Sequence, residues 1–304
     1  MAVHLCPGLT GDWLSAWLAA IGITVLIPDA KLSWTADRPP TAVIDTDNPR
    51  PLAEQIADLL PTPDQWWDRN PAIAPDPSQK KNTTRSMTPE EYRQRAELER
   101  RAQTKTLAAS LTDLAGRPLD QSHSPFDPAA PGSTGGVFHR VLDCLTAIPQ
   151  GGNHRAEWIQ TTLDGPGRRI AANGLGFDIR RITSGSLTDD AKKVDPVIEA
   201  LAHTGLDHFP VRGDGAAEHT RGWMGRRTTA GALAWPCWTE PLNRWAIDAL
   251  IDQFTQQRHI SGDDTATMRT QTRTLGITHA FTVVPYKPKS SADATRGYGS
   301  QPWW

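Results

Sequence analysis

The sequence predicts an α+β fold, with mixed or antiparallel sheets, packed helices and long Pro/Gly-rich loops. Several segments place apolar residues at helical spacing behind a clear helix start, as at Asp195-Pro196. Other segments are short and β-rich, and the run ITHAFTVVPY at 277–286 is the plainest of them. The 25 prolines and 24 glycines among 304 residues indicate long, irregular connections between these elements.

Residues 1–60 are expected to form an N-terminal helix followed by a β-meander. Thr10 or Asp12 is a suitable cap for a helix whose apolar positions continue to Ile21, and Gly22 is expected to end it. The next apolar run, 23–27, then predicts a buried strand. Two short strands are expected around 31–34 and 41–44, and a second helix within 49–60.

Residues 61–134 are predicted to be Pro-rich linkers around one charged helix. That helix begins at Thr88-Pro89-Glu90-Glu91, which combines a cap, a proline and acidic residues in the first turn, and it is expected to continue to about Leu114. Its arginines are read as a solvated face, with a basic groove as the alternative. The KKNTTRS segment before it is interpreted as a solvated loop.

Residues 135–286 are predicted to be the main α+β core, and 287–304 a flexible C-terminal tail. In the core, the helix from Asp195 ends at Gly205, and a strand at 206–211 leads into a loop rich in arginine and glycine. An apolar strand at 232–238 follows, and Glu240-Pro241 is expected to open another helix.

The composition excludes few functions, although it constrains the fold. The formal net charge of −2 argues against a uniformly basic surface that coats nucleic acid, although local basic patches are compatible with it. The three cysteines, Cys6, Cys144 and Cys237, are far apart and form no zinc or disulfide pattern. We therefore expect a cytoplasmic protein with no membrane contact, since no signal sequence or spanning segment is found either. The 12 tryptophans suit core packing or partner anchoring better than base stacking.

Two arginine-rich segments are the candidate nucleic-acid contacts. Guanidinium groups bind phosphates through charge-assisted hydrogen bonds, and a tryptophan among them could stack on a base. The alternative for the second segment is ordinary surface charge balanced by nearby aspartates. The candidate residues are Arg212, Arg221, Trp223, Arg226 and Arg227 in the glycine-rich loop, and Arg168, Arg169, Arg180 and Arg181 in the second segment.

Recognisable catalytic chemistry is absent from the sequence. No HExxH or GxSxG motif occurs, and the STGG at 133–136 lacks the lysine and the spacing of a P-loop. His203, His208 and His219 stand alone, as surface or capping histidines do. We therefore expect no catalytic residue, no metal and no cofactor, while an active site scattered along the chain stays open as an alternative.

Two parts of the chain resemble a known family. The segment HLCPGLTGDWLSAWLAAIGITVL at 4–26 looks like the start of large or accessory subunits of type I-G (formerly I-U) CRISPR effector complexes, also called Cascade. DPVIEALAHTGLDHFPVRGDG at 195–215, followed by RGWMG and ALAWPCWTEPLNRWAIDALI, is similar to a later part of the same group. The resemblance covers about a quarter of the chain, which is shorter than typical large subunits.

The resemblance implies a non-catalytic subunit of an RNA-guided surveillance complex. Such a subunit binds guide RNA or target DNA and other effector subunits, and large subunits also sense the flanking motif and help recruit a helicase-nuclease. The alternatives are a metal-dependent nuclease and a protein-only assembly subunit that contacts its partners through tryptophans.

Overall fold

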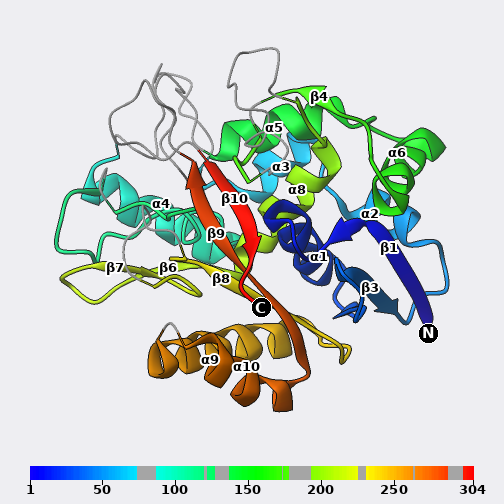
Figure 1. The fold of residues 1–304 in the computed structure, drawn as a ribbon. Coiled ribbons are helices and arrows are strands. Elements are labelled where there is room, and N and C mark those ends of the chain that lie inside the picture. The colour runs from blue at the N-terminus through cyan, green and yellow to red at the C-terminus, as the bar shows by residue number, and fades with distance from the viewer. Residues whose placement is uncertain are drawn as a thin grey trace.

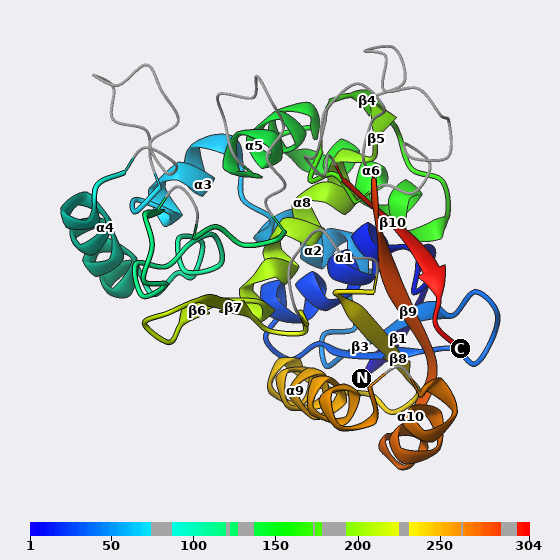
Figure 2. The same cartoon turned by 60° about the vertical axis from the view of Figure 1, so that its left-hand side comes forward.

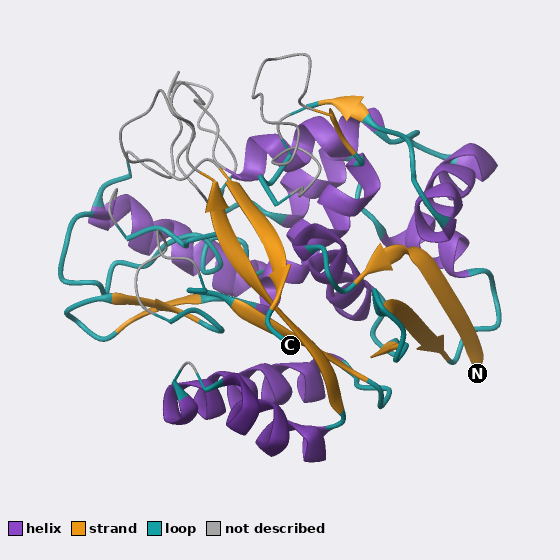
Figure 3. Cartoon of the chain, in the orientation of Figure 1, coloured by secondary structure: helices purple, strands orange, loops and turns teal. Residues whose placement is uncertain are grey.

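The computed structural model describes residues 1–73, 87–119, 122–126, 137–172, 174–177, 193–224, 231–262, 264–286 and 297–304. Helices pack around two three-stranded antiparallel sheets, and two small two-stranded sheets lie at the edges (Figure 3). The protein therefore has the α+β fold that its sequence predicts.

Helix α1 (Leu14–Leu26) lies at the centre of the molecule (Figures 1 and 2). Every residue from Leu14 to Thr24 is buried, as expected for a helix that is apolar on all sides. It contacts α8 (Pro196–Gly205), strands β1 and β2, and helix α9. The sheets and the other helices thus assemble around one apolar helix near the beginning of the chain.

The contact between α1 and α8 depends on two glycines. A Cβ on Gly22 would lie 2.0 Å from the carbonyl oxygen of Leu201, and a Cβ on Gly205 would lie 2.2 Å from that of Leu18. Gly22 is therefore an interior contact residue, and the expectation that it ends the helix was wrong. The run 23–27 continues α1 to Leu26 instead of forming a strand, because the buried contacts of the helix extend past Gly22 to Ile23 and Thr24.

The first sheet has the strand order β1-β3-β2, with β1 (Ala2–Thr10), β2 (Lys31–Trp34) and β3 (Thr41–Thr46). The two short strands expected around 31–34 and 41–44 are confirmed as β2 and β3, whereas the expected strand at 23–27 is helical and β1 was not expected. Alternate residues face the core, and they are Cys6, Leu32, Trp34, Ala42 and Ile44.

The second sheet has the order β10-β9-β8, with β8 (Ala234–Trp238), β9 (Ile277–Tyr286) and β10 (Gly297–Pro302). Strands β8 and β9 confirm the two β-rich segments. Residues 297–302 form an edge strand, so this part of the chain is not the flexible tail that was expected. The reason is Tyr298, whose side chain is fully buried and whose hydroxyl donates to the carbonyl oxygen of Pro125 over 2.8 Å.

Tryptophans join the two sheets and α1. The ring of Trp34 meets that of Trp238 edge-on at 6.4 Å, and the Trp238 indole donates to the carbonyl oxygen of Leu32. Trp17 of α1 donates in the same way to Pro236, and Trp235 donates to Gly11. These residues confirm core packing as a main role of tryptophan in this chain.

The remaining helices surround this centre (Figure 1). They are α2 (Leu52–Leu59), α3 (Pro63–Arg69), α4 (Pro89–Ala102), α5 (Val137–Ala147), α6 (Gly152–Asp164), α9 (Arg244–Ser261) and α10 (Thr265–Thr272), with short 3-10 turns η3 (Leu206–His208) and η4 (Arg273–Leu275). The small sheets pair β4 (Ile170–Ala171) with β5 (Lys193–Val194) and β6 (Val211–Gly213) with β7 (Glu218–Thr220).

Several element boundaries differ from those expected. Helix α4 has the expected start, a full capping box at Thr88, but it ends at Ala102 because Gln103 adopts a left-handed conformation with φ 56°. The expected strand at 206–211 is the turn η3 followed by β6. Helix α9 begins at Arg244, where the Asn243 side chain accepts from two backbone N–H groups, and not at Glu240-Pro241.

One hydrophobic core runs through the four segments inferred from sequence. Its buried residues extend from Cys6 to Tyr298 and include Trp66, Met87 and Leu107 of the segment predicted as linkers. The division into 1–60, 61–134, 135–286 and 287–304 therefore marks stretches of different composition that share a core. Among the described helices, none is both long and apolar enough to cross a membrane.

Candidate nucleic-acid interface

The β6–β7 hairpin carries Arg212, one of the predicted phosphate contacts. Arg212 is exposed and stands opposite His219 in the hairpin register. It forms no hydrogen bond or ion pair with any residue that the structure describes. The hairpin is held to the segment after α4 by backbone hydrogen bonds from Val211 to Ala108 and from Gly215 to Leu114. Arg212 is thus a cation available on a well-anchored hairpin.

Arg221 is largely buried and pairs with acidic side chains of the protein. Its side chain is 12% exposed, and its guanidinium pairs with Asp248 and, over 2.8 Å, with Asp252, both on α9. It also donates to the carbonyl oxygen of His208 over 2.9 Å. The expectation that Arg221 meets a polyanion is corrected here, because its charge is already neutralised by two carboxylates that fasten this loop to α9.

Trp223 is a core residue. Its side chain is 9% exposed, and its ring meets those of Phe126 and Tyr298 at centroid distances of 5.3 and 5.4 Å. Stacking on a base requires an accessible ring face. The expectation that Trp223 stacks on a base is therefore corrected: its ring packs in an aromatic cluster with Phe126 and Tyr298.

Four predicted contacts lie outside the described residues. They are Arg180 and Arg181 in one segment and Arg226 and Arg227 in the other. Their binding of phosphate stays a prediction.

Arg168 and Arg169 lie after α6, next to β4 and β5. Both are exposed, and the Arg168 guanidinium carbon lies 5.0 Å from the ring centroid of Trp158. Arg169 donates to the carbonyl oxygen of Lys193. In both views β4 lies far from β6 and β7, so the structure separates these arginines from Arg212 (Figures 1 and 2).

Sequence reasoning missed two aromatic neighbours of Arg168. His154 and Trp158 are one turn apart on α6, with ring centroids 6.4 Å apart. His154 is exposed and Trp158 is half-buried. The missed signal was the i, i+4 spacing of these rings in a segment whose apolar residues are too few to mark a helix. We call His154, Trp158, Arg168 and Arg169 the α6 platform.

The α6 platform has the chemistry of a single-strand binding surface. An arginine stacked on an indole is a planar, cationic and aromatic unit, and such units stack with bases of any sequence. A second exposed arginine follows directly in the chain. The platform thus offers a stacking face with positive charge beside it.

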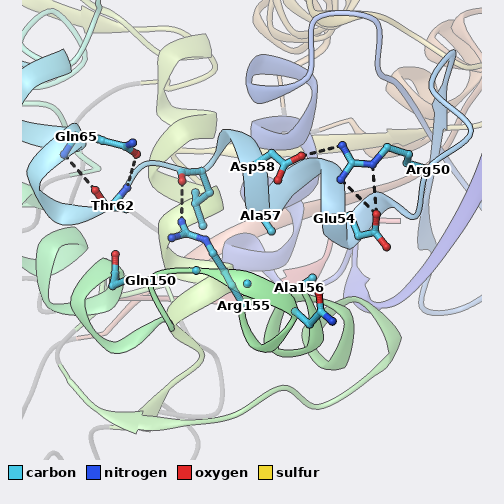
Figure 4. Close-up of a pocket in the computed structure, with 13 residues that line it drawn as sticks. Arg50, Glu54, Ala57, Asp58, Thr62, Gln65, Gln150, Arg155 and Ala156 are labelled. Atoms are coloured by element: carbon cyan, nitrogen blue, oxygen red, sulfur yellow. Dashed lines mark hydrogen bonds and ion pairs between the residues drawn. The ribbon is translucent and has the colours of Figure 1, made fainter.

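A polar pocket of about 440 Å³ lies between α2, α3 and the beginning of α6 (Figure 4). In one half, Arg50 forms ion pairs with Asp58 at 2.8 Å and Glu54 at 3.3 Å. The other half holds Arg155, Thr62, Gln65 and Gln150. The two halves differ in charge pairing: in the first half, Arg50 pairs with both carboxylates, whereas the second half contains a cation, Arg155, and no carboxylate among the lining residues.

Arg155 is a buried cation. Its side chain is 4% exposed, and burial lowers the pKa of its guanidinium. Nη2 donates to the carbonyl oxygens of Leu60 at 2.7 Å and Pro61 at 3.3 Å. Arg155 thereby caps the end of α2, and no carboxylate of the described residues pairs with it.

The histidines singled out in the sequence have structural partners. Nδ1 of the buried His208 lies 2.8 Å from Asp248, and the exposed His219 lies 2.9 Å from Asp214. Burial lowers the pKa of His203 to about 4, so this ring is neutral at physiological pH. In the part of the chain that the structure describes, no three His, Cys, Asp or Glu side chains gather into a metal-binding group.

The charged helix α4 carries its own counter-ions. Arg100 and Arg101 both bind Glu97, and these hydrogen bonds lower the pKa of its carboxyl group to about 2. Arg93 pairs with Glu90 over 3.4 Å. The solvated face is therefore favoured over the basic groove for this helix.

Comparison with known proteins identifies no match to this chain. No protein-family model matches the chain, and neither a curated protein nor a solved structure is similar to it. The functional argument therefore depends on the residues themselves.

Proposed function

We propose that this protein is a non-catalytic, nucleic-acid-binding subunit of an RNA-guided CRISPR surveillance complex. It contacts guide RNA or target DNA through the α6 platform, with Arg212 as a separate phosphate contact. The observation that carries the nucleic-acid part of the proposal is the exposed Arg168 guanidinium over the half-buried ring of Trp158, whose other ring neighbour is His154.

The chemistry of the platform favours a single strand over a duplex. Stacking on Trp158 requires an unpaired base, and Arg168 and Arg169 are placed to neutralise the phosphates on either side of it. The net charge of −2 is compatible with this, because a local cationic face suffices for a guided contact and the remaining surface does not attract DNA indiscriminately.

Membership of the complex is supported by how the resembling segments are arranged. The segment 4–26 supplies α1, and the segment from Asp195 supplies α8, which packs directly on it. The later segment supplies β8, whose Pro236 accepts a hydrogen bond from Trp17 of α1. The segments that resemble the family are far apart in sequence but pack together in one core. Such packing is expected if the short apolar motifs belong to one shared fold.

The resemblance also provides the partners of the proposal. They are the guide RNA, the target DNA, the other effector subunits and a helicase-nuclease that the complex recruits. Sensing of the flanking motif belongs to the same proposal.

The test is binding of a fluorescent single-stranded RNA or DNA of about 12 nucleotides, a length within known single-strand site sizes. Trp158→Ala should weaken binding about tenfold or more, because one stacked base contributes about 1–3 kcal/mol. Arg168→Ala with Arg169→Ala should lower the log–log salt slope by about 0.7 per lost contact.

Trp245→Ala is the matched control, because Trp245 is also stacked by an arginine, Arg244, at 4.8 Å but lies on α9. It should leave binding unchanged. The proposal would be contradicted if the platform variants bound RNA as tightly as the wild type does and also bound DNA as tightly as the wild type does.

The exposure of Trp245 favours one second candidate, a protein-only assembly subunit. Its side chain is 65% exposed, which is unusual for tryptophan and typical of a partner anchor. If Trp245→Ala abolishes co-purification with effector subunits while Trp158→Ala changes nothing, the protein-only role is the correct one.

A further inference from the structure

The N-terminus of α6 has the properties of an anion site. Its cap residue is Gly151, no side chain caps the helix, and no acidic residue stands in its first turn. The N–H groups of Gly152, Asn153 and His154 therefore lack intrahelical acceptors, and the helix dipole adds partial positive charge there. This end of α6 lines the pocket.

An independent observation points to a ligand, and it is the state of Arg155. Its Nη2 donates to the carbonyl oxygens of Leu60 and Pro61, whereas the buried Nε has no acceptor among the residues that the structure describes. A buried cation without a carboxylate is costly, and an anion bound in the pocket would offset that cost. Figure 4 shows the Arg155 side chain extending from α6 into the pocket, where Nη2 donates to the carbonyl oxygen of Leu60.

The carboxylates of the pocket do not supply this anion. Asp58 and Glu54 both bind Arg50, and neither forms an ion pair with Arg155. In Figure 4 they lie on the opposite side of the pocket from Gln65 and Gln150. The half of the pocket around Arg155 is therefore the half that an anion would occupy.

The pocket is large enough and open enough for a phosphate. Its volume is about 440 Å³, and a Cβ on Gly151 or on Gly152 would meet no atom within 4 Å. Gly152 has φ 67°, a conformation that favours glycine. Close approach of a phosphate to the backbone N–H groups is the usual way in which a helix N-terminus binds one.

The pocket and the platform share one helix. Arg155 follows His154 directly, and Trp158 comes one helical turn, about 5.4 Å, after His154. The pocket is lined by the first residues of α6 and by Arg155, and neither His154 nor Trp158 lines it. A single strand would therefore have to pass from Trp158 around the N-terminus of α6 to make both contacts.

We propose that Arg155 and the uncapped N-terminus of α6 form a pocket for one phosphate group of the strand that lies on the α6 platform. This inference rests on the proposed function and adds a defined phosphate position to it. The chemistry recognised is a phosphate with at least one free oxygen edge, so inorganic phosphate is a suitable probe.

The test uses two variants at the cap position. Gly151→Asp places a carboxylate at the helix N-terminus, whereas Gly151→Asn places a neutral side chain of the same shape there. Both residues are good caps, and the extended backbone of Gly151, with φ −179°, accepts either. Both variants should therefore fold with an equal or higher melting temperature, and they differ only in charge.

Titration of each protein with inorganic phosphate, followed by NMR of the Gly152 and Asn153 amides, reads the pocket directly. We expect phosphate-dependent shifts in the wild type and their loss in Gly151→Asp. The same variant should weaken binding of a single-stranded RNA about tenfold and lower its salt slope by about 0.7, the value for one lost contact on a single strand. Gly151→Asn, whose neutral side chain competes for the same N–H groups but does not repel the anion, should lose less of both.

The outcomes separate this inference from the proposed function. If RNA binds and depends on Trp158, but Gly151→Asp leaves its affinity and slope unchanged, the pocket proposal is overturned and the platform stands. If phosphate shifts the amides while no RNA binds, the site takes free phosphate only and the nucleic-acid role fails. Arg155→Met provides a second reading, since it must abolish the phosphate shifts if Arg155 is a ligand.

Discussion

Glu99 is a buried carboxyl group in the last turns of α4. Its side chain is 7% exposed, and its oxygens accept hydrogen bonds from the backbone N–H groups of Leu107 and Ala108. Burial raises the pKa of Glu99 to about 7, and the two hydrogen bonds only partly oppose that effect. The folded protein therefore holds a proton that the unfolded chain has already released between about pH 4.5 and pH 7.

We predict that this proton makes stability depend on pH. Because the folded-state pKa is the higher one, the stabilisation is complete below about pH 4.5 and is lost as the pH rises to about 7, by up to about 3 kcal/mol. Glu99→Gln should remove this fall. Urea unfolding at several pH values between 4.5 and 7.5 measures it.

Glu97→Gln is the control on the same helix. The pKa of Glu97 is lowered to about 2, so its titration lies below that window, and the pH slope should stay as in the wild type. The assignment to Glu99 would be contradicted if the wild-type stability did not fall from pH 5 to pH 7. It would also be contradicted if Glu99→Gln showed the same fall.

Arg221 and Arg212 differ in what they bind, and their substitution should separate stability from binding. Arg221→Ala removes one of the two partners of Asp248 and the donor to the His208 carbonyl, so we expect a loss of about 2 kcal/mol or more in unfolding free energy. Its effect on the salt slope of RNA binding should be negligible.

Arg212→Ala should do the reverse. Its side chain is exposed and forms no ion pair with described residues, so stability should change by less than about 0.5 kcal/mol. The salt slope should fall by about 0.7 if Arg212 touches a phosphate. Chemical denaturation and anisotropy titrations on the two variants decide between these roles.

At the scale of elements, the α1–α8 contact is the most sensitive to substitution. Gly22→Ala would push a methyl group to 2.0 Å from the Leu201 carbonyl oxygen, and two backbones cannot separate without opening the core around them. We expect a loss of at least about 3 kcal/mol, seen as a lowered melting temperature or a failure to fold. Gly151→Ala, where the new methyl group meets nothing within 4 Å, should cost about 1 kcal/mol at most, which reflects only the poorer helix cap that alanine makes.

Helix starts with complete capping signals were predictable from the sequence. Thr88 with Glu91 forms a capping box, and Asp195 accepts from the N–H groups of Val197 and Ile198. These signals are local, so they survive without tertiary information. Helix α6 was missed because Gly151 provides no cap and few of its positions are apolar, and that missing cap is also what makes its N-terminus a candidate site.

At the scale of the whole molecule, the fold class could be predicted but the candidate site could not. Arg221 appeared to be a surface cation because its partners Asp248 and Asp252 are 27 and 31 residues away in sequence and adjacent only in the fold. Trp223 was misassigned for a similar reason, since Phe126 and Tyr298 reach it from distant segments. Local composition shows which charges exist, and tertiary contacts decide which of them are neutralised.

The pairing of α1 with α8 bears on how the chain is made in a cell. The first of these helices is finished at Leu26, whereas its partner ends at Gly205. At a synthesis rate of about 5–20 residues per second, the ribosome needs roughly ten to thirty seconds to supply that partner. Throughout this interval a helix whose residues are mostly apolar lacks the partner that buries it, so nascent chains should depend on a chaperone that shields it.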